Sequence, residues 1–116
     1  MKDRIGFIGV GTMGLPMARR LLAAGYHVGF TPRRQQAAEA LEAAGGRAFP
    51  TPLVVADHSD TLLTCLPSDR ELFEVYLGPG GVLEHLGPGA TVIDLSTTSP
   101  MIMQRIVAEA QRRSIH

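Results

Sequence analysis

A glycine-rich segment near the start of the chain has the residue types that bind phosphate groups. Gly9, Gly11 and Gly14 stand in the spacing G-x-G-x-x-G, between an apolar run and a helical pattern. In such a turn the first glycine permits the tight bend, the second lets the backbone approach a pyrophosphate, and the third allows close helix packing. Free N–H groups at the helix start would face the phosphates. We therefore predict a dinucleotide site whose contacts are Gly9, Val10, Gly11, Thr12, Met13 and Gly14.

The end of the second expected strand carries the residues that should select the dinucleotide. An NAD site usually has an acid there, about twenty residues after the first glycine, to bond the ribose 2′-hydroxyl. This chain has Thr31-Pro32-Arg33-Arg34 instead. A guanidinium pairs well with a 2′-phosphate, although two solvated arginines at a helix start are the alternative. We expect Thr31, Arg33 and Arg34 to contact the cofactor and favour NADP, with NAD left open.

Short polar side chains also follow the fourth and fifth expected strands, in residues 66–69 and 94–100. The carboxyl ends of parallel strands share one edge of a sheet, and open sheets bind ligands there. These two segments should therefore flank the nicotinamide. The hydroxyls of Ser96 and Thr97 suit a substrate carboxylate or the nicotinamide ribose.

The elements that position these residues alternate along the chain. The patterns predict strands at 5–10, 26–31, 47–49, 61–66 and 91–95, and helices at 13–24, 35–44, 52–57, 69–77, about 82–86 and 100–113. Thr51, Asp69 and Ser99 are expected to cap helices. The alternation indicates an α/β fold, a Rossmann-type doubly wound parallel sheet with strand order 3-2-1-4-5. Because the sequence ends where a sixth strand should start, we expect the fifth strand to be an exposed edge, open to dimerisation.

Composition limits the remaining possibilities. A chain of 116 residues that is 45% hydrophobic predicts one domain, 1–116. Eleven basic and eleven acidic residues cancel, which argues against nucleic acid and anionic membranes as partners. Neither a membrane span nor a signal peptide is evident, so a cytoplasmic location is expected. Cys65 is the single cysteine and is expected to be an inert core thiol, the four histidines are scattered, and no metal site is predicted.

The chain resembles the β-hydroxyacid dehydrogenases, the group of 3-hydroxyisobutyrate dehydrogenase, tartronate semialdehyde reductase and, more distantly, 6-phosphogluconate dehydrogenase. Residues 5–18 resemble that family's cofactor signature, including Met13-Gly14-Leu15-Pro16-Met17. Cys65-Leu66-Pro67 resembles its Met-Leu-Pro segment, which lies against the cofactor. Residues 94–100 resemble its substrate-binding Asp-x-Ser-Thr-x-x-Pro loop.

The resemblance implies reversible hydride transfer between NADP(H) or NAD(H) and a short 3-hydroxy acid or its semialdehyde, in a homo-oligomer. It implies cofactor contacts by Cys65, Leu66, Pro67 and Thr97, and substrate contacts by Ser96 and Thr97. Pro32 departs from the pattern, because relatives often have Asn or Asp there, and this removes a ribose-bonding side chain. Relatives also carry a catalytic lysine and a C-terminal helical domain beyond the part that this chain matches. We therefore expect no catalytic residue in this chain, and binding without turnover.

Two other functions fit the same residues. One is the cofactor half of an imine reductase, although the Asp-x-Ser-Thr-x-x-Pro loop argues against it. The other is a standalone nucleotide-binding module without catalysis.

Overall fold

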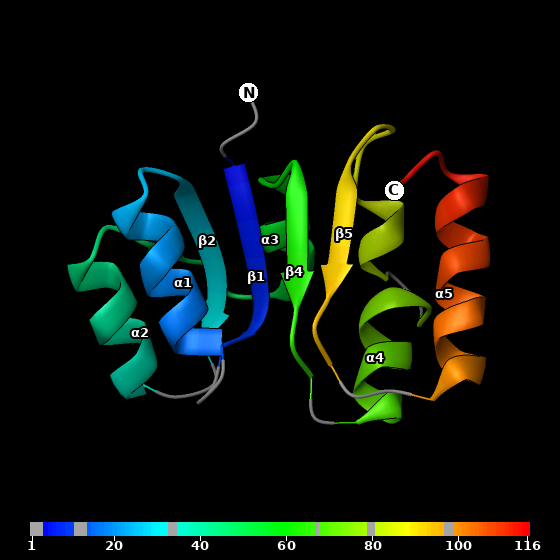
Figure 1. The fold of residues 1–116 in the computed structure, drawn as a ribbon, viewed down its shortest axis with the longest axis horizontal. Helices are drawn as coiled ribbons and strands as arrows, with labels where there is room; N and C mark the ends of the chain where they lie inside the picture. The colour runs from blue at the N-terminus through cyan, green and yellow to red at the C-terminus, as the bar shows by residue number, and fades with distance from the viewer. Residues whose placement is uncertain (1–3, 11–13, 33–34, 67, 79–80, 97–98) are drawn as a thin grey trace.

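The fold is a five-stranded parallel sheet between two layers of helices (Figure 1). The computed structural model describes residues 4–10, 14–32, 35–66, 68–78, 81–96 and 99–116. The strands lie in the order β3-β2-β1-β4-β5, which confirms the predicted α/β class and Rossmann-type topology. Their bounds are β1 (Arg4–Val10), β2 (His27–Pro32), β3 (Arg47–Ala48), β4 (Thr61–Thr64) and β5 (Thr91–Asp94).

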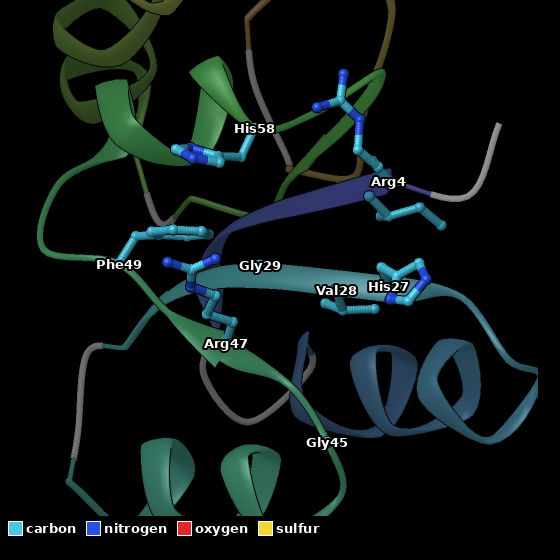
Figure 2. A pocket seen from close by; sticks show the side chains of 9 residues that line it. Arg4, His27, Val28, Gly29, Gly45, Arg47, Phe49 and His58 are labelled. Atoms are coloured by element: carbon cyan, nitrogen blue, oxygen red, sulfur yellow. The ribbon is translucent and has the colours of Figure 1, made fainter. Parts of the chain in front are cut away.

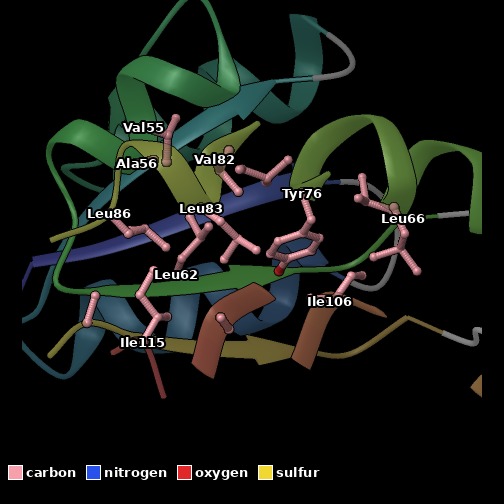
Figure 3. Packing of buried hydrophobic residues seen from close by; sticks show 14 of the residues in the cluster. Val55, Ala56, Leu62, Leu66, Tyr76, Val82, Leu83, Leu86, Ile106 and Ile115 are labelled. Atoms are coloured by element: carbon pink, nitrogen blue, oxygen red, sulfur yellow. The ribbon is translucent and has the colours of Figure 1, made fainter. Parts of the chain in front are cut away.

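The helices divide between the two faces of the sheet. Helices α1 (Gly14–Ala23) and α2 (Gln35–Ala43) enclose one apolar cluster, into which β1 contributes Ile5 and Phe7. The opposite cluster contains Ile8 of β1, because successive side chains of a strand point to opposite faces. Its other walls are α3 (Pro52–Asp57), α4 (Asp69–Tyr76), the 3₁₀ helix η1 (Val82–Glu84) and α5 (Pro100–Arg112), as Figure 3 shows.

Three predicted helix caps can be compared with the structure. Thr51 accepts a hydrogen bond from Val54 N at 3.3 Å and Ser99 accepts one from Ile102 N at 3.4 Å, so both caps are confirmed. The prediction for Asp69 was wrong, because Ser68 caps α4. Ser68 has the extended backbone that lets its hydroxyl reach the amide three residues on, whereas its neighbour is already the first helical residue.

The expected open edge at β5 is only partly present. After α5 a turn at Ser114 leads the chain back beside β5, and Ile115 is buried in the core. Val92 N donates to His116 O at 2.7 Å, and His116 N donates to Ala90 O at 2.8 Å. The start of the edge is therefore covered by the chain itself, and the expectation was wrong there. Farther along, the side chains of Ile93 and Leu95 stay 43% and 38% exposed.

None of the helices in the described ranges is long and apolar enough to cross a membrane.

Candidate functional site

Near its end β1 has a glycine that no other residue could replace without strain. Gly9 has a φ of +89°, in the region that L side chains rarely adopt. A Cβ at this position would overlap the carbonyl oxygen of Cys65, which lies just beyond β4. Both the backbone conformation and the space therefore require glycine, as the sequence pattern predicted for the first glycine of the turn.

The start of α1 lies directly against the end of β1. Gly14 is the first residue of α1 and is buried. A Cβ there would lie 3.0 Å from Phe7 Cε1 and 3.3 Å from the carbonyl oxygen of Gly9. The absence of a side chain thus allows the close approach of helix and strand that a pyrophosphate-binding turn needs. Gly11, Thr12 and Met13 lie outside the described residues.

The ends of β4 and β5 extend to the same edge of the sheet. Cys65 N donates to Ile8 O at 3.0 Å, and Leu95 N donates to Thr64 O at 2.8 Å. Thr31 near the end of β2 pairs with Ile8 of β1. The predicted site residues Gly9, Gly14, Thr31, Cys65, Leu66 and Ser96 therefore share the carboxyl edge of the sheet, whereas Arg33, Arg34, Pro67 and Thr97 lie outside the described residues.

Ser96 joins the two segments that follow β4 and β5. Its hydroxyl accepts a hydrogen bond from Leu66 N at 2.6 Å and donates one to Asp94 Oδ1 at 2.8 Å. A second link runs from Ser99 N to Asp69 Oδ1, at 3.0 Å. Asp69, expected to cap its own helix, instead ties the β4 segment to the start of α5.

Two buried hydroxyl groups extend the hydrogen bonds of the Asp94 carboxylate into the core. Thr64 Oγ1 donates to Asp94 Oδ1 at 2.7 Å and lies 2.6 Å from the hydroxyl oxygen of Tyr76. Thr64 is 0% exposed and Tyr76 is 2% exposed. In Figure 3 the tyrosine side chain crosses the core from α4, and its oxygen lies at β4. Burial is the main cause that raises the pKa of Tyr76, so this hydroxyl keeps its hydrogen.

A hollow lies at the amino edge of the sheet, where the strands begin (Figure 2). Its volume is about 360 Å³, and its lining includes Arg4, His27 and Arg47, the first residues of β1, β2 and β3. Phe49 stacks on the ring of His58 with centroids 4.7 Å apart, and the Arg47 guanidinium lies 5.0 Å from the centre of the phenyl ring. This hollow and the glycine turn lie at opposite edges of the sheet, so the hollow is not part of the predicted cofactor site.

Residues 4–116 match the family described as the NAD binding domain of 6-phosphogluconate dehydrogenase. The chain belongs to this family. The match covers every described residue and includes the glycine turn, the Leu66 segment and the Ser96 segment.

Curated relatives of this NAD-binding domain are dehydrogenases. A probable 3-hydroxyisobutyrate dehydrogenase-like protein of Arabidopsis thaliana is 37% identical over 112 residues, and an NAD-dependent L-serine dehydrogenase of Pseudomonas aeruginosa is 36% identical over 112 residues. Each match covers 97% of this chain and 38% of the relative. The chain therefore spans little more than a third of these proteins' length.

Solved structures with a similar fold cover nearly the whole chain. Mycobacterium tuberculosis 3-hydroxyisobutyrate dehydrogenase with L-serine has a TM-score of 0.87 at 29% identity, over 99% of this chain and 38% of that one. Psf3 in complex with NADP+ and 2-OPP has a TM-score of 0.87 at 29% identity, over 96% of this chain and 39% of that one. An imine reductase of Myxococcus stipitatus in complex with NADP+ has a TM-score of 0.83 at 21% identity, over 96% of this chain and 38% of that one, and shows likeness of fold alone.

The turn of this NAD-binding domain fits the pyrophosphate of a dinucleotide. A side chain at Gly14 would fill the space between the end of β1 and the start of α1, and one at Gly9 would overlap the Cys65 carbonyl, so both positions leave backbone open to a ligand. In the described part of the chain no group of three or more His, Cys, Asp or Glu residues could hold a metal ion. Cys65 is a free, partly buried thiol packed against the core, as predicted.

Sequence reasoning placed Asp94 in the segment that should flank the nicotinamide but gave it no role, and it did not find Thr64 or Tyr76 as parts of the site. One signal was present in the sequence, because a threonine at the end of an apolar strand needs a hydrogen-bond partner when it is buried. The partner could not be predicted from the sequence, because Tyr76 and Asp94 lie 12 and 30 positions away from Thr64 along the chain.

Proposed function

We propose that the chain is the nucleotide-binding part of an oxidoreductase that moves a hydride between a nicotinamide cofactor and a short 3-hydroxy acid or its semialdehyde. The observation that carries this proposal is the glycine cradle formed by Gly9 and Gly14 at the same sheet edge as Ser96. The cradle suits a pyrophosphate, and the Ser96 segment lies where open parallel sheets bind the reacting end of a ligand.

The residue roles follow from position and from the family resemblance. Backbone amides of the turn from Gly9 to Gly14 would hold the pyrophosphate, and Thr31 would lie near the adenosine ribose. Cys65, Leu66, Pro67 and Thr97 would line the cofactor, and Ser96 with Thr97 would reach the substrate. When bound, the nicotinamide supplies the hydride acceptor or donor.

Among the residues that the structure describes, no group is evident for the accompanying proton transfer. Proton transfer needs a side chain within hydrogen-bond reach of the reacting oxygen and a pKa near the working pH. Tyr76 is buried and its pKa is raised by that burial, and Asp94 already accepts two hydrogen bonds. We propose that a lysine outside this chain acts as the general acid and base, so the chain alone would bind without turnover.

We propose that NADP is preferred over NAD. The support is the sequence at the end of β2, where Thr31-Pro32-Arg33-Arg34 has no acid for a ribose 2′-hydroxyl and offers guanidinium groups for a 2′-phosphate. Calorimetry with both dinucleotides tests this. Arg33→Ala should weaken NADP+ binding on the order of tenfold and leave NAD+ binding unchanged. The matched control is Arg47→Ala, an exposed arginine at the opposite edge of the sheet.

The activity itself is tested in the protein that carries this chain. Assays with 3-hydroxyisobutyrate, L-serine, short semialdehydes and cyclic imines should show turnover of a hydroxy acid or semialdehyde. Turnover of imines alone would favour the imine reductase alternative, and the fold likeness to imine reductases is the reason to include them. A native protein with the mass of this chain alone, and no turnover, would favour a standalone binding module.

A homo-oligomer and a cytoplasmic location also stay proposals. The exposed side chains of Ile93 on β5 and Leu95 just after it support a partner at that edge, and sedimentation of the native protein tests it. Several curated relatives are mitochondrial, so localisation of a tagged protein is needed for the compartment.

A further inference from the structure

The hydrogen bonds around Asp94 have only one consistent set of directions. A hydroxyl has one hydrogen, and an ionised carboxylate only accepts. Thr64 gives its hydrogen to Asp94 Oδ1 at 2.7 Å, so Thr64 Oγ1 must accept from the Tyr76 hydroxyl at 2.6 Å. Ser96 gives its hydrogen to the same carboxylate oxygen at 2.8 Å and accepts from Leu66 N at 2.6 Å. Thr64 and Ser96 therefore both donate to one oxygen of Asp94, while Tyr76 donates to Thr64 and Leu66 N donates to Ser96.

The strand register explains why these groups meet. Thr64 and Asp94 are direct partners in the parallel pairing of β4 with β5. Tyr76 reaches Thr64 from the end of α4, through a core in which both residues are almost fully buried. A buried hydroxyl has no water to exchange with, so the set of directions is fixed by the protein.

We propose that Tyr76, Thr64 and Asp94 are positioning residues that orient the Ser96 hydroxyl, so that it holds the Leu66 backbone at the cofactor edge. In this arrangement the Ser96 hydroxyl donates its hydrogen to Asp94 and uses one lone pair to accept from Leu66 N. Its second lone pair stays available to accept a hydrogen bond from a ligand. A substrate group that meets Ser96 would thus be a hydrogen-bond donor, such as an alcohol, and a carboxylate would need donors elsewhere. The hydrogen-bond arrangement follows from the distances between these residues, and its link to cofactor and substrate rests on the proposed function.

The test measures the backbone amide of Leu66 by NMR in the 116-residue chain. In Ser96→Ala we expect its proton resonance to move upfield and its protection from hydrogen exchange to fall on the order of tenfold. Asp94→Leu should give a similar change. Asp94→Asn should keep the resonance near its original place, because the amide oxygen still accepts from Thr64 and Ser96.

Variants farther along the chain of hydrogen bonds should have smaller effects on the same resonance. Thr64→Val should move it less than Ser96→Ala, and Tyr76→Phe should move it least. The matched controls are Thr61→Val, at the other end of β4, and Ser59→Ala, a buried serine whose hydroxyl donates to Val55 O at 2.5 Å. Neither control should move the Leu66 resonance. Ser96→Thr should leave the Leu66 resonance near its wild-type position, because the hydroxyl is retained.

Titration with NADP+ and NAD+ separates this inference from the proposed function. If the chain binds dinucleotide, Ser96→Ala should raise the Kd several-fold, and Ser59→Ala should leave it unchanged. A wild-type chain that binds no dinucleotide would defeat the proposed function, while the amide measurements would still judge the hydrogen-bond arrangement. A Leu66 resonance unmoved by Ser96→Ala or Asp94→Leu would overturn the inference, and so would a moved resonance with an unchanged Kd.

Discussion

Gly9 and Gly89 have the same backbone φ of +89°, and they lie at opposite edges of the sheet. A Cβ on Gly9 would overlap the Cys65 carbonyl, whereas a Cβ on Gly89 would meet nothing within 4 Å. The two edges differ in the same way elsewhere. At the carboxyl edge Thr64 and Tyr76 are buried and hydrogen-bonded, whereas at the amino edge Arg4 pairs with Asp60 in partial contact with solvent.

This difference shows that conformation alone does not make a position critical. The same positive φ is tolerable where a side chain would have space, and intolerable where another backbone segment already fills that space. At the carboxyl edge the end of β1 and the segments after β4 and β5 approach one another closely, which is what a backbone-lined ligand site needs. If the two edges differ in energy as they do in geometry, substitutions at the carboxyl edge should cost more than matched substitutions at the amino edge.

Alanine at the two glycines should give the largest contrast. Gly89→Ala should lower the free energy of unfolding by about 1–2 kcal/mol, the backbone cost of a left-handed conformation. Gly9→Ala adds an overlap with backbone atoms, which costs a further 1–3 kcal/mol or so. Urea denaturation measures both values, and dinucleotide titration should show a loss only for Gly9→Ala. Equal destabilisation by the two substitutions would mean that the edges do not differ.

Two threonines of one strand repeat the comparison with a hydroxyl. Thr64→Val at the carboxyl edge leaves the buried Tyr76 hydroxyl without its acceptor and should cost about 1–3 kcal/mol. Thr61→Val, at the amino end of β4, should stay within about 0.5 kcal/mol of the wild-type free energy of unfolding. The double variant Thr64→Val, Tyr76→Phe should cost less than the sum of its two single variants. Strict additivity in denaturation experiments would contradict a direct bond between the two hydroxyls.

The aromatic stack at the amino edge should contribute less. Arg47→Ala removes a guanidinium 5.0 Å from the centre of the Phe49 ring and should cost about 0.5–1 kcal/mol. The cost should disappear in a Phe49→Leu background, which thermal or urea unfolding can measure. The hollow at the amino edge is not the proposed cofactor site, so Arg47→Ala should leave the dinucleotide affinity unchanged. A weaker affinity would mean that the amino edge also contributes to dinucleotide binding.

The ion pair between Arg4 and Asp60 should have the smallest effect. Its guanidinium nitrogen lies 2.8 Å from Asp60 Oδ1, and hydrogen bonding by Arg4 is the main cause that lowers the pKa of Asp60. A lowered folded-state pKa stabilises the fold above the ordinary carboxyl pKa, and the contribution is lost as the pH falls through the folded value. Both side chains are partly exposed, so Arg4→Gln should cost only about 0.2–1 kcal/mol near neutral pH.

The pH profile of unfolding checks this assignment. The difference between Arg4→Gln and wild type should shrink as the pH falls through the lowered pKa of Asp60, and concentrated salt should reduce it at neutral pH. A difference that stays constant in acid would mean that Arg4 stabilises the fold by packing and not by its charge.

Two errors of sequence interpretation have a common origin. Asp69 and Ser68 are both good capping residues, and only the backbone at the end of β4 decides that Ser68 takes that place and frees its neighbour to bind Ser99 N. The residues after α5 cover the start of β5 because the chain turns at Ser114, and no pattern in the sequence predicted this turn. Each outcome depends on a choice among local alternatives of similar free energy, which tertiary contacts then settle.

The sequence by itself determined the elements, the strand order and the glycine turn, because each depends on short-range patterns: apolar periodicity, helix stops and the spacing of Gly9, Gly11 and Gly14. Only the tertiary structure decided how Ser96 is held. The bonds from Tyr76 through Thr64 and Asp94 to Ser96 cross between α4, β4 and β5, and they exist because the β4–β5 register places Thr64 opposite Asp94. No local pattern encodes such a register, since it arises from how the whole core packs.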